Sequence, residues 1–73
     1  MNEEKKYSFN KLWCILIEKG MTKQELAEKA QISVSSLTRM KRGKPLLYKN
    51  MMRVVDAVGC KELSEIMDEV NNN

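Results

Sequence analysis

The sequence predicts a compact, all-α domain built from five helices. The chain of 73 residues contains only one proline and three glycines, and these are the residues that interrupt helices most strongly. Apolar residues recur at helical spacing in several stretches, and capping residues or glycines mark the ends of these stretches. A chain of this length suits one small domain. We expect a flexible segment over residues 1–6, the folded domain over 7–69 and a disordered tail over 70–73.

The first helix is predicted over about residues 8–19, with Ser8 as its cap and Gly20 as its stop. Its apolar residues cover more than half of its circumference, which is wider than the usual stripe. We interpret it as a central helix that is packed on several sides. Alternatively, Trp13 or Ile17 emerges at a dimer surface, because aromatic residues favour the cores of interfaces.

Two short helices joined by a tight turn are predicted next, over residues 23–30 and 34–41. Thr22 can cap the first of them, and Glu25 three residues later completes a capping box. Ser33 is a suitable N-cap for the second helix. Because only three residues separate the helices, packing fixes the angle between them.

The helix over residues 34–41 has two chemically different faces. The residues that we expect to face the core are Ser33, Ser36, Leu37 and Met40. The residues on the opposite face are Val34, Ser35, Thr38, Arg39 and Arg42. Arginine recognises the edge of guanine, and serine and threonine can hydrogen-bond to bases or phosphates. These properties are what a DNA recognition helix requires.

Two further helices are expected after a connector. Gly43 can end the helix over 34–41 in a left-handed conformation, and Pro45 keeps the preceding residue out of helical geometry. The fourth helix is expected from Leu47 or Tyr48 to Val58, and the fifth over about residues 61–69. The apolar residues of these two helices are Met51, Val54, Val55, Val58, Leu63, Ile66 and Met67.

The net charge of +3 conceals an uneven distribution. Residues 19–53 carry nine lysines and arginines against two glutamates, whereas residues 54–73 carry one lysine against five acidic residues. The basic part coincides with the two short helices, which favours binding to nucleic acid. Taken alone, the same charges are also typical of a solvated cationic surface.

The stretch from Thr22 to Gly43 resembles the helix-turn-helix of the Cro and phage-repressor type, the xenobiotic-response-element family of bacterial regulators. The positions that match the family pattern are Thr22, Glu25, Leu26, Ala27, Ile32, Ser33, Leu37 and Gly43. The resemblance covers about residues 7–67 and implies a lambda-repressor-like fold whose second and third helices form the motif. Two positions depart from the pattern. Gln31 replaces the usual glycine, which adopts the turn conformation at lower cost, and Lys23 replaces the usual glutamine.

The resemblance implies sequence-specific binding to double-stranded DNA and transcriptional regulation, which we expect to be repression. The segment over 33–41 is then expected to lie in the major groove. Arg39 is the candidate for a bidentate contact to guanine O6 and N7, and Val34 for a contact to a thymine methyl group. The residues implied to face bases are Val34, Ser35, Thr38 and Arg39. The residues implied to contact phosphates are Lys23, Ser33, Lys41, Arg42 and Lys44.

A single helix-turn-helix reads only a few base pairs, so we expect a homodimer on a pseudo-palindromic operator with half-sites about 34 Å apart. The alternative is a protein-interaction module, such as an antitoxin, whose acidic C-terminal helix binds a basic protein partner and whose DNA binding is secondary.

Other classes of function have little support in the sequence. The chain has no histidine and only two cysteines, so we expect no metal site, no cofactor and no enzymatic activity. It has no run of about 18 apolar residues and no signal-peptide core, so we expect no membrane span and a cytoplasmic location.

Overall fold

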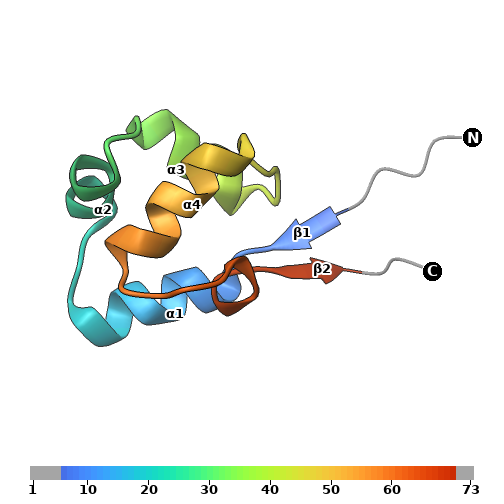
Figure 1. Cartoon of the computed structure of the whole chain (residues 1–73), viewed down its shortest axis with the longest axis horizontal. Helices are drawn as coiled ribbons and strands as arrows, with labels where there is room; N and C mark the ends of the chain where they lie inside the picture. Colours follow the sequence, from blue (N-terminus) through green and yellow to red (C-terminus); the bar gives the residue numbers. More distant parts are fainter. Residues whose placement is uncertain (1–5, 71–73) are drawn as a thin grey trace, which may run out of the picture.

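The computed structural model describes residues 6–70 of the chain (Figure 1). Within this range the elements are β1 (Lys6–Ser8), α1 (Asn10–Lys19), α2 (Lys23–Ala30), α3 (Val34–Lys41), α4 (Tyr48–Ala57), the 3-10 helix η1 (Leu63–Glu65) and β2 (Asp68–Val70). The two strands pair in antiparallel orientation, with Tyr7 opposite Glu69. The predicted mostly helical, compact architecture is therefore confirmed.

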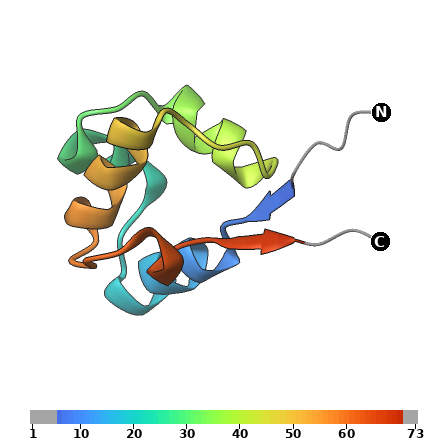
Figure 2. The same cartoon turned by 45° about the vertical axis from the view of Figure 1, so that its right-hand side comes forward.

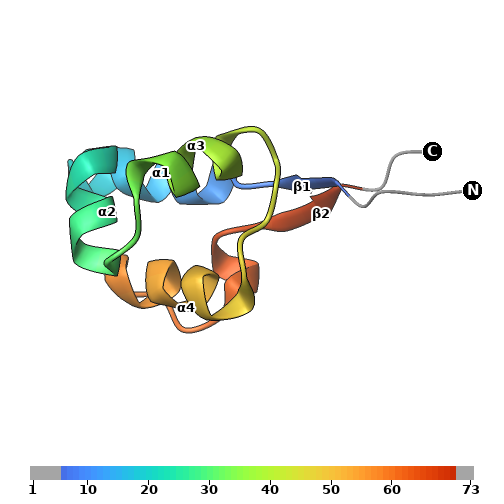
Figure 3. The same ribbon diagram turned by 90° about the horizontal axis from the view of Figure 1, so that it is seen from above.

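The helices enclose one hydrophobic core. Figures 1 and 3 show α2 at one end of the molecule and the strand pair at the opposite end. Helix α2 packs against both α3 and α4, and η1 packs against α4. The fully buried side chains come from α1, α2, α3, α4 and the segment after η1; they are Leu12, Leu26, Leu37, Val54, Val55 and Ile66, each with 0% of its surface exposed.

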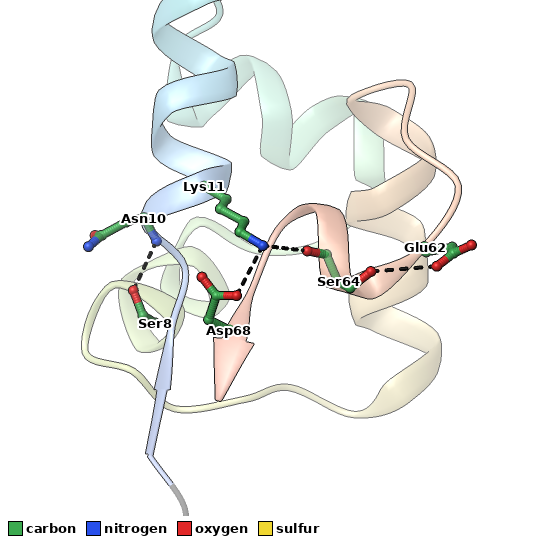
Figure 4. Close-up of polar contacts among 6 residues, drawn as sticks. All are labelled: Ser8, Asn10, Lys11, Glu62, Ser64 and Asp68. Carbon is green, nitrogen blue, oxygen red and sulfur yellow. Dashed lines mark hydrogen bonds and ion pairs between the residues drawn. The ribbon is translucent and has the colours of Figure 1, made fainter. Parts of the chain in front are cut away.

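Helix α1 begins two residues later than predicted, and one of its apolar side chains lies at the surface. It begins at Asn10, and the side chain of the preceding Phe9 is buried and makes no capping hydrogen bond. The hydroxyl of Ser8 instead accepts a hydrogen bond from the amide of Asn10 at 3.3 Å (Figure 4). Leu12 and Leu16 are buried, whereas Ile17 is 80% exposed, so α1 packs against the core and leaves Ile17 at the surface, as the alternative interpretation allowed. The stop at Gly20 is confirmed by its left-handed φ of 66°.

The predicted fifth helix over residues 61–69 is wrong, and four α-helices lie within residues 6–70. The Glu65 carboxylate accepts hydrogen bonds from the amides of Lys61 and Glu62 at 2.8 and 2.9 Å. These bonds stabilise a single 3-10 turn at η1. So short a segment has little intrinsic helical stability, and pairing with β1 satisfies the backbone groups of the residues that follow. Ile66, which was predicted as an apolar core residue of this segment, is completely buried.

The two ends of the described chain lie beside each other. Figure 2 shows β1 and β2 running side by side and leaving the helices at the same end. The predicted flexible segment 1–6 and disordered tail 70–73 fall outside the described residues except at Lys6 and Val70, which pair with each other. At these two positions the structure contains strand, which the sequence analysis did not anticipate.

Strand β1 also passes close to the end of α3. Gly43 has a φ of 80°, and a Cβ atom added to it would lie 2.8 Å from the carbonyl oxygen of Tyr7. Only a glycine allows this approach without displacing the strand. The sequence prediction that Gly43 takes a left-handed conformation is confirmed.

Within residues 6–70, no helix has both the length and the apolar character needed to cross a bilayer. The same part of the chain contains no group of three histidine, cysteine or acidic residues arranged to hold a metal ion.

Candidate nucleic-acid interface

The first helix of the predicted motif begins with the expected capping box. The Thr22 hydroxyl accepts a hydrogen bond from the Glu25 amide at 3.0 Å, and the Glu25 carboxylate accepts one from the Thr22 amide at 2.8 Å. The reciprocal bonds satisfy backbone donors that the first turn of α2 leaves unpaired. They also fix the entry of the chain into the motif.

The turn between α2 and α3 is held by a residue in a strained conformation. Gln31 ends α2 with a φ of 61°, and it is the only non-glycine residue with positive φ in the described part of the chain. The amide of Ile32 then donates to the Ala27 carbonyl at 3.0 Å, which closes the end of α2. The structure therefore confirms that Gln31 occupies a conformation that glycine adopts more cheaply.

Helix α4 holds this turn from outside the motif. The Arg53 guanidinium donates a hydrogen bond to the Gln31 carbonyl oxygen at 3.4 Å. Sequence reasoning assigned Arg53 only to the overall basic charge. No local signal indicates the contact, because the two residues are 22 positions apart.

Helix α3 presents the predicted pair of faces except at its start, where Ser33 is exposed and Ser36 is half-buried although both were expected to face the core. Ser33 caps the helix by accepting a hydrogen bond from the Ser36 amide at 3.2 Å. Leu37 and Met40 are buried, at 0% and 1% exposure. The residues that point to solvent include Val34, Ser35, Thr38 and Arg39. The structure thus brings all four predicted base-facing residues together on one exposed surface.

The Thr38 hydroxyl already has one partner. It donates to the Val34 carbonyl oxygen at 3.3 Å, one helical turn earlier. Its hydrogen is therefore engaged, whereas its lone pairs stay free to accept a hydrogen bond. This geometry suits an amino group on a base more than a carbonyl oxygen.

The basic residues predicted to contact phosphates differ in how much of their surface is exposed. Lys41, Arg42 and Lys44 are exposed at or just beyond the end of α3. Lys23 is half-buried, and its ammonium nitrogen lies 5.5 Å from the centre of the Trp13 ring. The structure brings Lys23 and Lys41 together, while Lys44 belongs to the connector, where its amide donates to the Arg39 carbonyl at 3.1 Å.

The contact between the two lysines has an electrostatic consequence. The neighbouring Lys41 side chain lowers the pKa of Lys23 by acting as a hydrogen-bond donor to its neutral form, and desolvation and charge repulsion lower the pKa further. Two neighbouring cations of this kind attract an anion, because the anion relieves their repulsion. Sequence spacing alone does not reveal the pair, since the two residues lie on different helices.

Comparisons with known proteins agree with this arrangement. The family model for the Cro/C1-type helix-turn-helix DNA-binding domain matches residues 11–71. A crystal structure of the transcriptional regulator VanUg is similar to this structure, with a TM-score of 0.84 and 22% sequence identity over 97% of this chain and 93% of that chain. No curated protein sequence shows significant similarity. At this level of identity the match to VanUg shows a common fold.

Proposed function

We propose that this chain, which belongs to the Cro/C1-type helix-turn-helix family of DNA-binding domains, is a transcriptional repressor specific for one operator sequence. The observation that carries this proposal is the surface of α3. Four side chains with different hydrogen-bonding and apolar properties are exposed on a helix whose other face is sealed in the core. Such a rigid, chemically varied surface is suited to the major groove.

Sequence discrimination is assigned to the exposed face of α3. Arg39 is proposed to bind guanine O6 and N7, which is the commonest specific contact between proteins and DNA. Val34, which is 48% exposed, is proposed to contact a thymine methyl group. Ser35 and Thr38 are proposed as hydrogen-bonding partners of neighbouring bases, with Thr38 acting as an acceptor.

Affinity is assigned to the phosphate contacts. The proposed contacts are Lys23, Ser33, Lys41, Arg42 and Lys44. Lysine and arginine release condensed counterions when they neutralise phosphates, so this part of the binding is sensitive to salt and indifferent to sequence. A binding function of this kind involves no catalytic step and no cofactor. We place it in the cytoplasm, with the DNA it binds.

We further propose that the regulator binds as a homodimer to a pseudo-palindrome. One α3 helix reads only a few base pairs, and a second copy doubles the sequence that is read. Leu47 and Tyr48 are 70% and 67% exposed, directly after the connector that follows α3. Adjacent exposed apolar side chains of this size are suited to a contact between two copies.

The protein-interaction alternative receives less support. It was based on an acidic helix over residues 61–69, which is not formed. The Glu65 carboxylate accepts backbone hydrogen bonds, and the Asp68 carboxylate pairs with Lys11. Two of the acidic groups offered for a basic partner are thus engaged within the fold.

Selection of random duplex DNA at low and moderate salt tests the proposal. We expect recovery of a palindrome whose half-sites are about one helical turn, roughly 34 Å, apart. Sedimentation of the selected complex then gives the number of protein copies per duplex. Recovery of no preferred sequence, with binding lost as salt rises, would contradict sequence-specific recognition; one copy per duplex would contradict the dimer.

A further inference from the structure

A hollow of about 330 Å³ lies between α1, the start of α2 and the end of α3. It is lined by Trp13, Leu16, Ile17, Met21, Lys23 and Lys41. Its volume lies at the lower end of the range of about 300–1,000 Å³ that is typical of small-molecule sites. It is therefore large enough for a ligand of one or two rings.

The walls of this hollow are apolar, and one of them is unusually exposed. Leu16 is buried at 4% exposure and belongs to the core. Ile17, on the same helix, is 80% exposed and is the most exposed large apolar residue in the described part of the chain. A ligand ring against Trp13 and Ile17 would remove this apolar surface from water.

The charged part of the hollow is entirely cationic. Lys23 and Lys41 are its two ionisable residues, and none of the lining residues is acidic. Both lysines line the same hollow, and Lys41 lowers the pKa of Lys23. A carboxylate placed between them would form charge-assisted hydrogen bonds to both and relieve their repulsion.

We propose that this hollow binds a small aryl carboxylate, with the ring against Trp13 and Ile17 and the carboxylate between Lys23 and Lys41. An aromatic ring matches the site because it buries a large apolar area while losing little conformational freedom. The charge complementarity identifies the ligand as an anion, and the apolar walls distinguish it from inorganic phosphate.

The position of the site gives the ligand a regulatory effect, and this consequence rests on the proposed function. Lys23 and Lys41 are both proposed to contact DNA phosphates. A carboxylate held between them occupies the place of a phosphate, so ligand and DNA compete. The ligand therefore releases the repressor from its operator.

Binding can be measured on the free protein through the single tryptophan. The chain contains one Trp, so its indole N–H gives one assignable proton resonance. Titration with 2-naphthoate is expected to shift this resonance saturably, with a dissociation constant below about 1 mM for a ligand of this size. The neutral 2-naphthamide and inorganic phosphate are each expected to bind several times more weakly.

Several results would overturn the inference. If 2-naphthamide binds as tightly as 2-naphthoate, the lysines do not recognise the carboxylate. If phosphate binds as tightly as 2-naphthoate, the site is a contact for small anions or DNA and the apolar walls contribute nothing. A resonance that does not move would exclude the ligand. A resonance that moves with protein concentration alone would show that a second copy occupies the hollow.

Variants at exposed positions locate the site without disturbing the core. Ile17→Ser is expected to weaken 2-naphthoate about fivefold or more through lost apolar contact, and to leave DNA affinity unchanged. Cys14→Ser, at an exposed position on the same helix, is the matched control and is expected to change neither. Lys41→Gln should reduce naphthoate binding to the level of the amide, whereas Lys41→Arg should retain it. Unchanged naphthoate binding in Ile17→Ser would place the ligand elsewhere.

Competition is measured by fluorescence anisotropy of labelled operator DNA, which is expected to fall as 2-naphthoate saturates the protein. If the selection yields no operator while naphthoate still binds, the proposed function fails and the site stands. If operator DNA binds and naphthoate neither shifts the indole resonance nor displaces the DNA, the site fails and the proposed function stands.

Discussion

The ammonium nitrogen of Lys11 lies 3.0 Å from a carboxylate oxygen of Asp68 (Figure 4). The same nitrogen donates to the Ser64 carbonyl oxygen at 2.9 Å, so one side chain on α1 holds two points of the C-terminal segment. Lys11 and Asp68 have side chains that are 47% and 56% exposed. Their contact therefore positions β2 against α1 more than it contributes to total stability.

Substitution at either end of this contact should have a modest, coupled effect. Lys11→Met and Asp68→Asn are each expected to lower the free energy of unfolding by about 0.5–1 kcal/mol. Their effects should be less than additive in a double-mutant cycle, because both remove the same ion pair. Urea unfolding followed by circular dichroism measures this, with Lys49→Met as the control. Full additivity would show that the ion pair contributes nothing.

Two of the three glycines with positive φ, Gly20 and Gly43, allow backbone strain to be distinguished from steric conflict. Gly20→Ala introduces strain alone, since no atom lies within 4 Å of the added Cβ, and should cost about 1 kcal/mol. Gly43→Ala also places its Cβ 2.8 Å from the Tyr7 carbonyl oxygen, so its cost should exceed about 2 kcal/mol. Thermal or urea unfolding of the two variants checks the order. Equal losses would mean that β1 moves aside without cost.

Replacement of Gln31 by glycine should stabilise the protein. A left-handed conformation costs a non-glycine residue about 1–2 kcal/mol, whereas the added flexibility of glycine costs about 0.5–1 kcal/mol. The expected net gain in the free energy of unfolding is roughly 0.5–1 kcal/mol. Gln31→Ala keeps the positive φ and the strain, so it is the control and should change little. A loss of stability in Gln31→Gly would indicate that the glutamine side chain makes a contribution of its own.

Arg39→Ala and Lys44→Ala should affect different components of DNA binding, namely sequence discrimination and salt-dependent affinity. Arg39→Ala is expected to cost about 1–3 kcal/mol of binding free energy on the preferred operator and to relax discrimination at one base pair. Lys44→Ala should weaken binding to all sequences similarly and flatten the dependence of affinity on salt. Anisotropy titrations against matched and mismatched duplexes at several salt concentrations distinguish them. A uniform effect of Arg39→Ala would remove its role in base recognition, and an unchanged salt slope in Lys44→Ala would remove its phosphate contact.

Acid should weaken the turn at η1. The backbone amides of Lys61 and Glu62 lower the pKa of the Glu65 carboxyl below its ordinary value of 4.5. A carboxyl with a lowered pKa in the folded state stabilises the protein above its unfolded pKa, and this contribution is lost as pH falls through the folded pKa. Glu65→Gln should therefore be less stable than the wild type at about pH 7, and the difference should shrink at about pH 3.

Urea unfolding at the two pH values measures this difference. Glu28→Gln is the control for the loss of one exposed carboxylate. A Glu65→Gln variant that matches the wild type at about pH 7 would show that the two hydrogen bonds to Glu65 do not stabilise the folded state.

The motif and much of the fold could be predicted because their signals are local. The capping box at Thr22 and Glu25 and the stop at Gly20 depend on residues within one helical turn of each other. The division of α3 into buried and exposed faces follows from helical periodicity, and Leu37 and Met40 are buried as predicted. Such signals need no knowledge of the rest of the chain.

The features that could not be predicted depend on distant partners. The sequence from Lys61 to Glu69 has helical periodicity, but β2 forms because β1 is available at the other end of the chain. The contact of Arg53 with the Gln31 carbonyl and the meeting of Lys23 with Lys41 arise only when helices pack. In each case tertiary contacts determine the conformation or the side-chain contact, and local sequence propensity does not.

The pairing of Lys6 with Val70 joins a residue that is synthesised early to one that is synthesised 64 positions later. The N-terminal strand and the four helices emerge first during synthesis. Strand β1 stays unpaired until β2 has been synthesised, and the core is incomplete until Ile66, which is fully buried, has been added. A nascent chain arrested before Ile66 lacks one of the fully buried side chains of the core and the partner strand of β1. The domain therefore completes its core and its strand pair only after residues 66–70 have been synthesised.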